Sequence, residues 1–188
     1  MKLDQEIVEI YSMMREALIS KGDVPHAEFF YKRLRKEFCI DIIPEIALEH
    51  PTRFVHPLGS VLGRAQYASH LVVYQNVGVG SNLKRERPVF NGPCVLFPGA
   101  KVLGRSVIGK NVYITANTVV MDQHVPDNCI VVPGVTAHES VYGGEPEIQY
   151  EACLRFKPTS RSVIADFFPE LRKPTPESLA ALGVEGYV

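Results

Sequence analysis

The sequence has little net charge and no long apolar run. Its 20 basic and 21 acidic residues leave a formal net charge of −1, which offers no electrostatic attraction to nucleic acid or to an anionic membrane. No apolar run approaches the roughly 18 residues that span a bilayer. The first twenty residues mix acidic with apolar side chains, unlike a secretory signal. We therefore expect a protein with no membrane span and no nucleic-acid partner.

Cysteines are also few. The four cysteines, Cys39, Cys94, Cys129 and Cys153, lie far apart and form no CxxC pair. This spacing argues against a zinc site and against a disulfide framework. Because disulfides are rare in reducing compartments, the pattern favours a cytoplasmic protein.

The N-terminal part of the chain predicts two helices. Apolar residues recur every three or four positions from Leu3 to Leu18, and Gly22 ends that helix. Asp23 is a suitable cap for a second helix, with Pro25 in its first turn. A late helix is expected between a cap at Thr175 and a stop at Gly183.

The middle of the chain holds a six-residue repeat. Cut from Phe90, it reads FNGPCV, LFPGAK, VLGRSV, IGKNVY, ITANTV, VMDQHV. The first position is apolar in all six hexads: Phe90, Leu96, Val102, Ile108, Ile114 and Val120. The fifth position is small or β-branched in the first five: Cys94, Ala100, Ser106, Val112 and Thr118. A narrow triangular coil requires this pattern, with aliphatic side chains inside and small ones at its corners. Glycine and asparagine, at positions such as 99, 109 and 117, supply the tight turns.

A β-sandwich is the alternative for a region rich in Val, Ile and Gly. Sandwich strands recur every 8–12 residues, which does not fit an unbroken period of six. The repeat also runs upstream through Ile42, Leu48 and Phe54, followed by two extra residues. We therefore predict a mainly β fold, a left-handed parallel β-helix of hexapeptide coils with an N-terminal helical cap and an irregular C-terminal tail. The expected divisions are residues 1–40, 41–134 and 135–188.

Two segments resemble a known family. DIIPEIALEHPTRFVHPLGSVLGRA, with VVYQNVGVGSNLKRERPVFNGPCVLFPGAKVLGRSVIGKNVYITANTVV after it, is similar to the coils of serine acetyltransferases, in the hexapeptide-repeat acyltransferase superfamily. The resemblance implies an acetyl-CoA-dependent O-acetyltransferase and a homotrimer. It also implies that Asp41 and His56, fifteen positions apart, form the catalytic pair. Histidine suits that role because an alcohol needs a base near neutral pH, and a carboxylate can fix its tautomer.

The resemblance assigns further residues to the two ligands. Acetyl-CoA is expected beside the later hexads, where small side chains let it approach the backbone at Gly99, Ala100, Ala116 and Asn117. Arg85 and Arg87, in a charged loop, are candidates for binding an anionic acceptor.

This sequence departs from the family both at positions that contact the acceptor and at positions along the CoA groove. Val55 replaces an acidic residue, and Glu86-Arg87-Pro88 replaces Arg-His-Pro. Phe97 and Pro98 stand where the family has small residues along the CoA groove. These departures leave open three functions: acetylation of serine or a similar small acceptor, acetylation of a sugar or sugar nucleotide in surface-polysaccharide synthesis, and an inactive scaffold.

The histidines suggest a metal site as an alternative. Carbonic anhydrases with this fold bind zinc through three imidazoles, two of them four or five residues apart. The candidate histidines contain no such pair: His50, His56, His70, His124 and His138. We therefore expect no metal. With only about 40 residues before the repeat, we also expect trimers that do not pair further.

Overall fold

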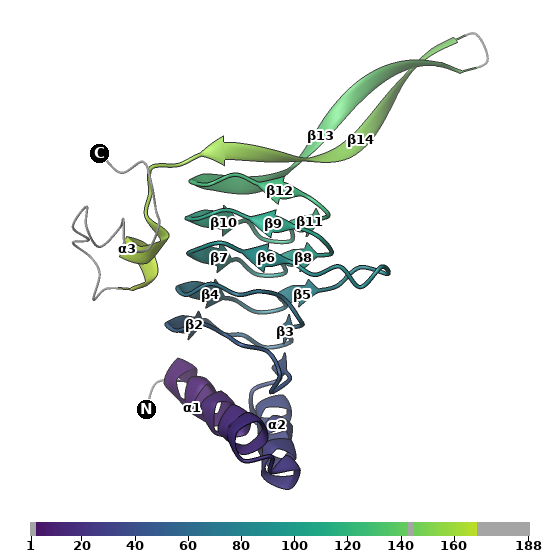
Figure 1. Cartoon of the computed structure of the whole chain (residues 1–188). Coiled ribbons are helices and arrows are strands. Elements are labelled where there is room, and N and C mark those ends of the chain that lie inside the picture. The colour runs from purple at the N-terminus through teal and green to yellow at the C-terminus, as the bar shows by residue number, and fades with distance from the viewer. Residues whose placement is uncertain (1–2, 143–144, 169–188) are drawn as a thin grey trace.

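The computed structural model describes residues 3–142 and 145–168. Figure 1 shows a stack of β-coils with two helices at one end and a long hairpin at the other. The predicted parallel β-helix and its helical cap are confirmed. Among the residues that the structure describes, no helix is long and apolar enough to cross a membrane.

The helical cap consists of α1 (Leu3–Arg15), a π-helical turn η1 (Glu16–Ser20) and α2 (Val24–Glu37). The predicted first helix thus ends earlier than Leu18 as an α-helix and continues with wider turns. The Asp23 carboxylate caps α2 by accepting a hydrogen bond of 3.2 Å from the backbone N–H of His26. The apolar stripes of both helices pack into the same core as the coils and close their lower end.

Three sheets form the walls of the coils, and their strands are parallel except for the last strand of sheet B, which pairs antiparallel with its neighbour. Sheet A contains β1 (Asp41–Ile42), β3 (Val61–Leu62), β5 (Gly78–Gly80), β8 (Lys101–Leu103) and β11 (Val119–Met121). Sheet B contains β2 (Thr52–Phe54), β4 (Leu71–Val73), β7 (Cys94–Leu96), β10 (Val112–Ile114), β13 (Cys129–Tyr142) and β14 (Glu145–Pro158). Sheet C contains β6 (Val89–Phe90), β9 (Val107–Ile108) and β12 (His124–Val125).

The hexads explain this architecture. All six first-position side chains are at most 2% exposed, and the five small fifth-position residues are fully buried at the corners. Within sheet B the register pairs Val73 with Leu96, one coil above it. Each coil therefore repeats the same inward contacts, which is why a six-residue period specifies the fold.

The C-terminal tail, which was expected to be irregular, contains two long strands and a short helix among its described residues. β13 pairs with β10 as a further parallel strand and with β14 as an antiparallel hairpin. A short helix, α3 (Val163–Phe167), then lies against the outer face of sheet B. The helix expected between Thr175 and Gly183 lies outside the described residues.

Candidate active site

His56 lies at a corner of the β-helix that is enlarged by two residues. Phe54 and Leu62 lie eight positions apart in the sequence. The residues that pair with them on the next coil, Val73 and Val79, lie only six positions apart. The two extra positions, predicted from the sequence, make the chain bulge between sheets B and A. His56 occupies this bulge with a left-handed φ of 47°. The insertion thus lifts the histidine out of the regular coil.

The His56 ring is exposed and borders a small pocket. The pocket has a volume of about 120 Å³ and lies between the coil and the helical cap, with Ile7, Phe38 and Leu58 among its walls. Within the described part of the chain, no hydrogen bond or ion pair engages the imidazole. Both ring nitrogens are therefore available to a ligand or to a residue from another chain.

Asp41 lies on the coil directly beneath that of His56, because β1 pairs Asp41 with Val61 in β3. Its half-buried carboxylate accepts a hydrogen bond of 2.9 Å from the hydroxyl of Tyr31 in α2. Burial, together with the adjacent carboxylate, raises the pKa of Tyr31 and keeps it a donor. Among the described residues no hydrogen bond joins Asp41 to His56. Tyr31 is a neighbour of the predicted pair that the sequence pattern did not reveal.

The four predicted CoA-binding residues lie along the same corner as His56, on higher coils. This corner carries a column of left-handed residues: Gly59, Asn76, Gly99 and Asn117. A Cβ on Gly99 would approach the Asn117 Oδ1 atom to 2.2 Å, so this position requires glycine. The structure therefore brings His56 and the predicted CoA residues to one edge of the stack, which we call the A/B edge.

The four residues are not equally accessible. Ala116 and Asn117 are exposed and Gly99 is half-buried, but the Ala100 side chain is fully buried. The Ala100 N–H donates to the Phe97 carbonyl, and the Ala100 carbonyl accepts from Gly78. Ala100 therefore shapes the corner from inside, while Gly99, Ala116 and Asn117 form its surface.

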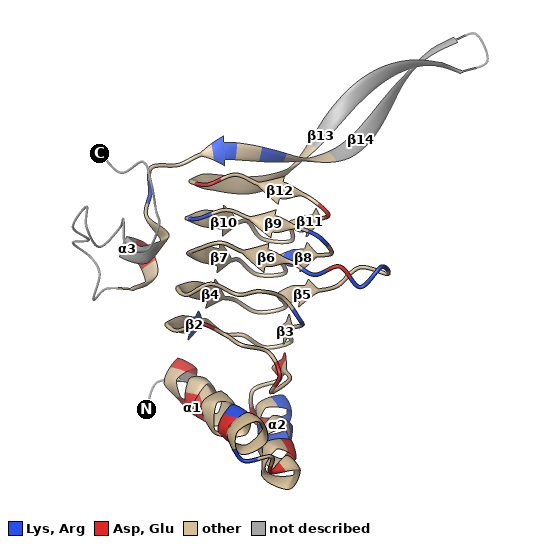
Figure 2. Ribbon diagram, in the orientation of Figure 1, with Lys and Arg blue, Asp and Glu red and all other residues tan. Residues whose placement is uncertain are grey.

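Arg85 and Arg87 lie at a different edge. The loop after β5 projects from the side where sheet A meets sheet C, and its charged residues are visible in Figure 2. Asn82 organises this loop: its side-chain carbonyl accepts from the backbone N–H groups of Lys84 and Glu86. Within one chain, sheet A separates these arginines from His56.

A larger cleft lies beside the A/B edge, under the C-terminal segment. It has a volume of about 500 Å³ and is lined by Phe97, Tyr113, Thr115, Ile130, Arg161, Asp166 and Phe167. The Phe97 ring stacks between Tyr74, at 5.3 Å, and Tyr113, at 6.4 Å. Bulky Phe97, singled out in the sequence, is thus part of an aromatic column on the outer face of sheet B.

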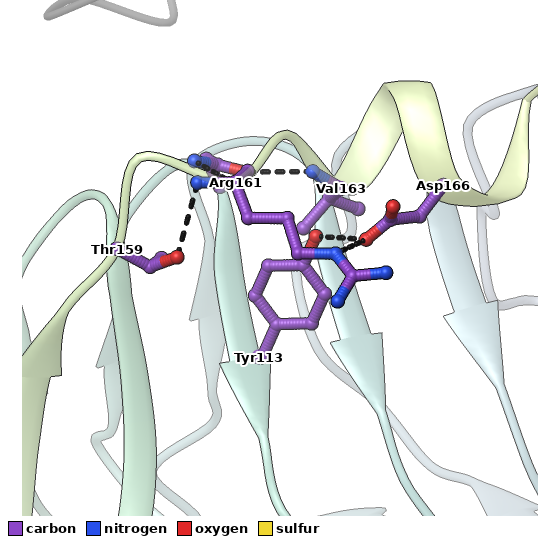
Figure 3. Close-up of polar contacts among 6 residues, drawn as sticks. Tyr113, Thr159, Arg161, Val163 and Asp166 are labelled. Carbon is purple, nitrogen blue, oxygen red and sulfur yellow. Dashed lines mark hydrogen bonds and ion pairs between the residues drawn. The ribbon is translucent and has the colours of Figure 1, made fainter.

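Polar contacts hold the C-terminal segment in place (Figure 3). The Tyr113 hydroxyl donates to Asp166 over 2.6 Å, and the Arg161 Nε donates to the same oxygen over 2.7 Å. The Asn111 side chain accepts from the Val163 N–H and donates to the Arg161 carbonyl. No sequence signal pointed to the contacts of Tyr113 and Asn111, because they join residues about 50 positions apart.

Two of the thiols are unsuited to nucleophilic chemistry. Burial raises the pKa of Cys94 far above its ordinary value, and raises that of Cys129 to about 11. In the residues that the structure describes, no group of three or more His, Cys, Asp or Glu side chains is arranged to hold a metal ion.

No family profile matches the sequence, but individual proteins do. Over 107 residues the chain is 35% identical to the serine acetyltransferase of Synechococcus elongatus, covering 54% of this chain and 43% of the relative. Over 157 residues it is 29% identical to the serine acetyltransferase of Bacillus pumilus, covering 74% of this chain and 69% of the relative. The chain therefore spans less than half the length of the first of these relatives.

Solved structures agree with this similarity. A serine acetyltransferase in complex with cysteine is 25% identical with a TM-score of 0.59, over 66% of this chain and 49% of that chain. A serine acetyltransferase in complex with CoA shares the fold at 24% identity and a TM-score of 0.59, over 66% of this chain and 52% of that chain. In sequence and in fold, the chain is thus similar to serine acetyltransferases, and it shares with them a β-helix of hexapeptide coils.

Proposed function

We propose that this protein is an acetyl-CoA-dependent O-acetyltransferase that acetylates the hydroxyl of L-serine or of a similar small acceptor. The observation that carries the proposal is the arrangement of His56 and the predicted CoA residues along the A/B edge, in a serine acetyltransferase-like β-helix. The relatives named as serine acetyltransferases, and a neighbour with CoA bound, support the reaction class and the co-substrate.

In the proposed reaction His56 acts as a general base. It takes the proton from the acceptor hydroxyl while the oxygen attacks the thioester carbonyl carbon. The new carbon–oxygen bond forms, the carbon–sulfur bond breaks, and the proton returns from His56 to the leaving CoA sulfur. No covalent enzyme intermediate is required. Asp41, anchored by Tyr31, would orient the imidazole and stabilise its protonated form once substrates close the site.

We also propose a homotrimer in which each site is completed between two subunits. The reason is that Arg85 and Arg87 lie between β5 of sheet A and β6 of sheet C, whereas His56 lies between β2 of sheet B and β3 of sheet A. A second copy that packs against sheet A can bring its loop to the A/B edge of the first. The outer face of sheet A carries half-exposed Val61, Val119 and Met121, which such packing would bury. The trimer thereby joins the base and the acceptor-binding arginines.

Acetylation of a sugar or sugar nucleotide is the second candidate, and Val55 favours it. Val55 stands in place of the family's acidic residue and packs against the apolar cluster outside sheet B. It provides no carboxylate for the ammonium group of serine. The free thiols of Cys94 and Cys129 fit a reducing compartment, so we place either reaction in the cytoplasm.

The proposal is tested by measuring thiol release from acetyl-CoA with a panel of amino acids and sugars. His56→Ala should lower kcat by about 10²–10⁴-fold, since it removes the general base. CoA affinity should stay nearly unchanged, because the imidazole acts on the acceptor hydroxyl. His50→Ala, an exposed histidine outside the site, is the matched control.

The melting temperature of each variant separates chemistry from folding. A histidine with only a structural role would lower the melting temperature and leave turnover proportional to the folded fraction. Full turnover in a folded His56→Ala variant would remove the catalytic assignment.

A further inference from the structure

Three arginines occupy equivalent places on three successive coils. The ladder of sheet C pairs Gln66 with Val89, and Val89 with Val107. Two positions before each of these paired residues the chain carries an arginine: Arg64, Arg87 and Arg105. Neighbouring coils are about 4.8 Å apart, so the three residues form a column along the edge between sheets A and C. We call it the arginine column.

All three side chains are exposed and carry no ionic partner within the described residues. Figure 2 shows basic residues gathered along this side of the stack, around the base of the projecting loop. Like charges stacked one coil apart repel each other and stabilise nothing in the fold. This concentration of positive charge favours the binding of an anion.

A pocket adjoins the lower part of the column. It has a volume of about 430 Å³, and Arg64 and Arg87 both line it, together with Gln66. Ile46 and Ala65 add an apolar wall. Arg64 and Arg87, on adjacent coils, thus border one cavity that can hold more than an anionic group alone.

Among the described residues, the acidic groups near the column form no ion pair with its arginines. Glu86 and Asp122 both accept hydrogen bonds from the side-chain amide of Asn82, and Asp122 also accepts from the backbone N–H of Arg105. Glu45 lines the same pocket but forms no ion pair with either arginine. Two arginines and one glutamate line the cavity, so the charge of its lining is positive on balance.

We propose that the arginine column binds the diphosphate group of a small-molecule ligand. A guanidinium group binds an oxyanion through two parallel hydrogen bonds. Two such groups about one coil spacing apart match two linked phosphates, whereas a single carboxylate would engage only one of them. Arg105 adds charge on the next coil, and the apolar wall contacts the organic part of the ligand. Arg87 is also one of the two proposed acceptor-binding residues, so the column adjoins the proposed acceptor site, but binding of a diphosphate does not itself require acetyl transfer.

The test is calorimetric titration of the full chain with inorganic pyrophosphate and with inorganic phosphate. Pyrophosphate should bind more tightly than phosphate, and its affinity should fall as ionic strength rises. Arg64→Gln and Arg87→Gln should each weaken pyrophosphate binding by about tenfold, since each removes a charge-assisted pair of hydrogen bonds. Arg105→Gln should have a smaller effect, because it lies beyond the pocket.

Lys36→Gln, which removes one exposed charge from α2, is the matched control and should leave binding unchanged. The melting temperature of Arg64→Gln should not fall, since the column contributes repulsion to the fold. The proposal is overturned if the parent does not bind pyrophosphate, or if Arg64→Gln and Lys36→Gln bind it equally well.

Two further titrations identify the source of the diphosphate. If Arg64→Gln weakens the binding of CoA, the column holds the co-substrate. If it leaves CoA binding intact and weakens that of UDP-N-acetylglucosamine, the column holds a nucleotide-linked acceptor. A parent that binds pyrophosphate through the column but releases no thiol from acetyl-CoA would refute the proposed reaction and leave this site standing.

Discussion

The outer faces of sheets A and B differ in how much apolar surface they expose to solvent. On the outer face of sheet B, Val72, Val95 and Tyr113 are at most 6% exposed, because the segment around α3 covers them. On the outer face of sheet A, Val61 and Val119 remain 46% and 50% exposed. Both faces carry apolar residues, yet only one is covered by the chain itself.

The difference bears on where the proposed trimer would place its subunit contact. A parallel sheet is normally covered on both sides, and an apolar face left bare favours association. The aliphatic part of the Lys101 side chain covers a part of sheet A, since it occupies the space beside Gly78 where a Cβ atom would stand. The C-terminal segment makes any further cover of sheet B unnecessary. The comparison therefore favours sheet A over sheet B as the contact surface of the proposed trimer.

The largest expected effect comes from placing charges on sheet A. The double variant Val119→Asp/Met121→Asp should convert the trimer to monomers, because each unpaired charge buried at the contact costs about 3–5 kcal/mol. Analytical ultracentrifugation at micromolar concentration measures this. Ile19→Asp, a similarly exposed position on η1, should leave the trimer intact. A monomeric parent protein would contradict the assignment of sheet A.

A substitution in the segment that covers sheet B should lower the stability of the fold and leave assembly unchanged. Phe168 is fully buried, its ring lies 4.9 Å from that of His70, and the Arg53 guanidinium lies 5.4 Å above it. Phe168→Ala should lower the free energy of unfolding by about 3–5 kcal/mol, the usual loss for a buried aromatic side chain. Urea denaturation of the variant measures this, with fully exposed Leu83→Ala as the control. An unchanged midpoint would mean that the segment does not cover sheet B in solution.

The coils could be predicted from the sequence because the residue types within each hexad indicate which of its side chains are buried. An apolar first position and a small fifth position are local signals, and both were confirmed by burial. The enlarged corner at His56 was equally visible, because two added residues interrupt a strict period. The cap at Asp23 also followed from local chemistry.

The C-terminal region was harder to predict for the opposite reason. α3 has only five residues, and its position depends on contacts with Asn111 and Tyr113 on a distant coil. Neither residue is unusual in a hexad. The register of β13 likewise comes from pairing with Val112 rather than from its own periodicity. The sequence therefore contained no sign that this segment covers sheet B.

The smallest expected effect concerns the hydrogen bond that fixes α3 to the coils. Tyr113→Phe removes the hydroxyl that donates to Asp166 and keeps the aromatic stack with Phe97. We expect a loss of about 1 kcal/mol, because Asp166 keeps its hydrogen bond from Arg161 and is partly reached by water. A double-mutant cycle with Asp166→Asn isolates the contact from other consequences of each change. Additive losses in that cycle would show that the hydroxyl does not engage Asp166. A coupling of the expected size, with the trimer unaffected, would confirm that sheet B is covered by its own chain and takes no part in assembly.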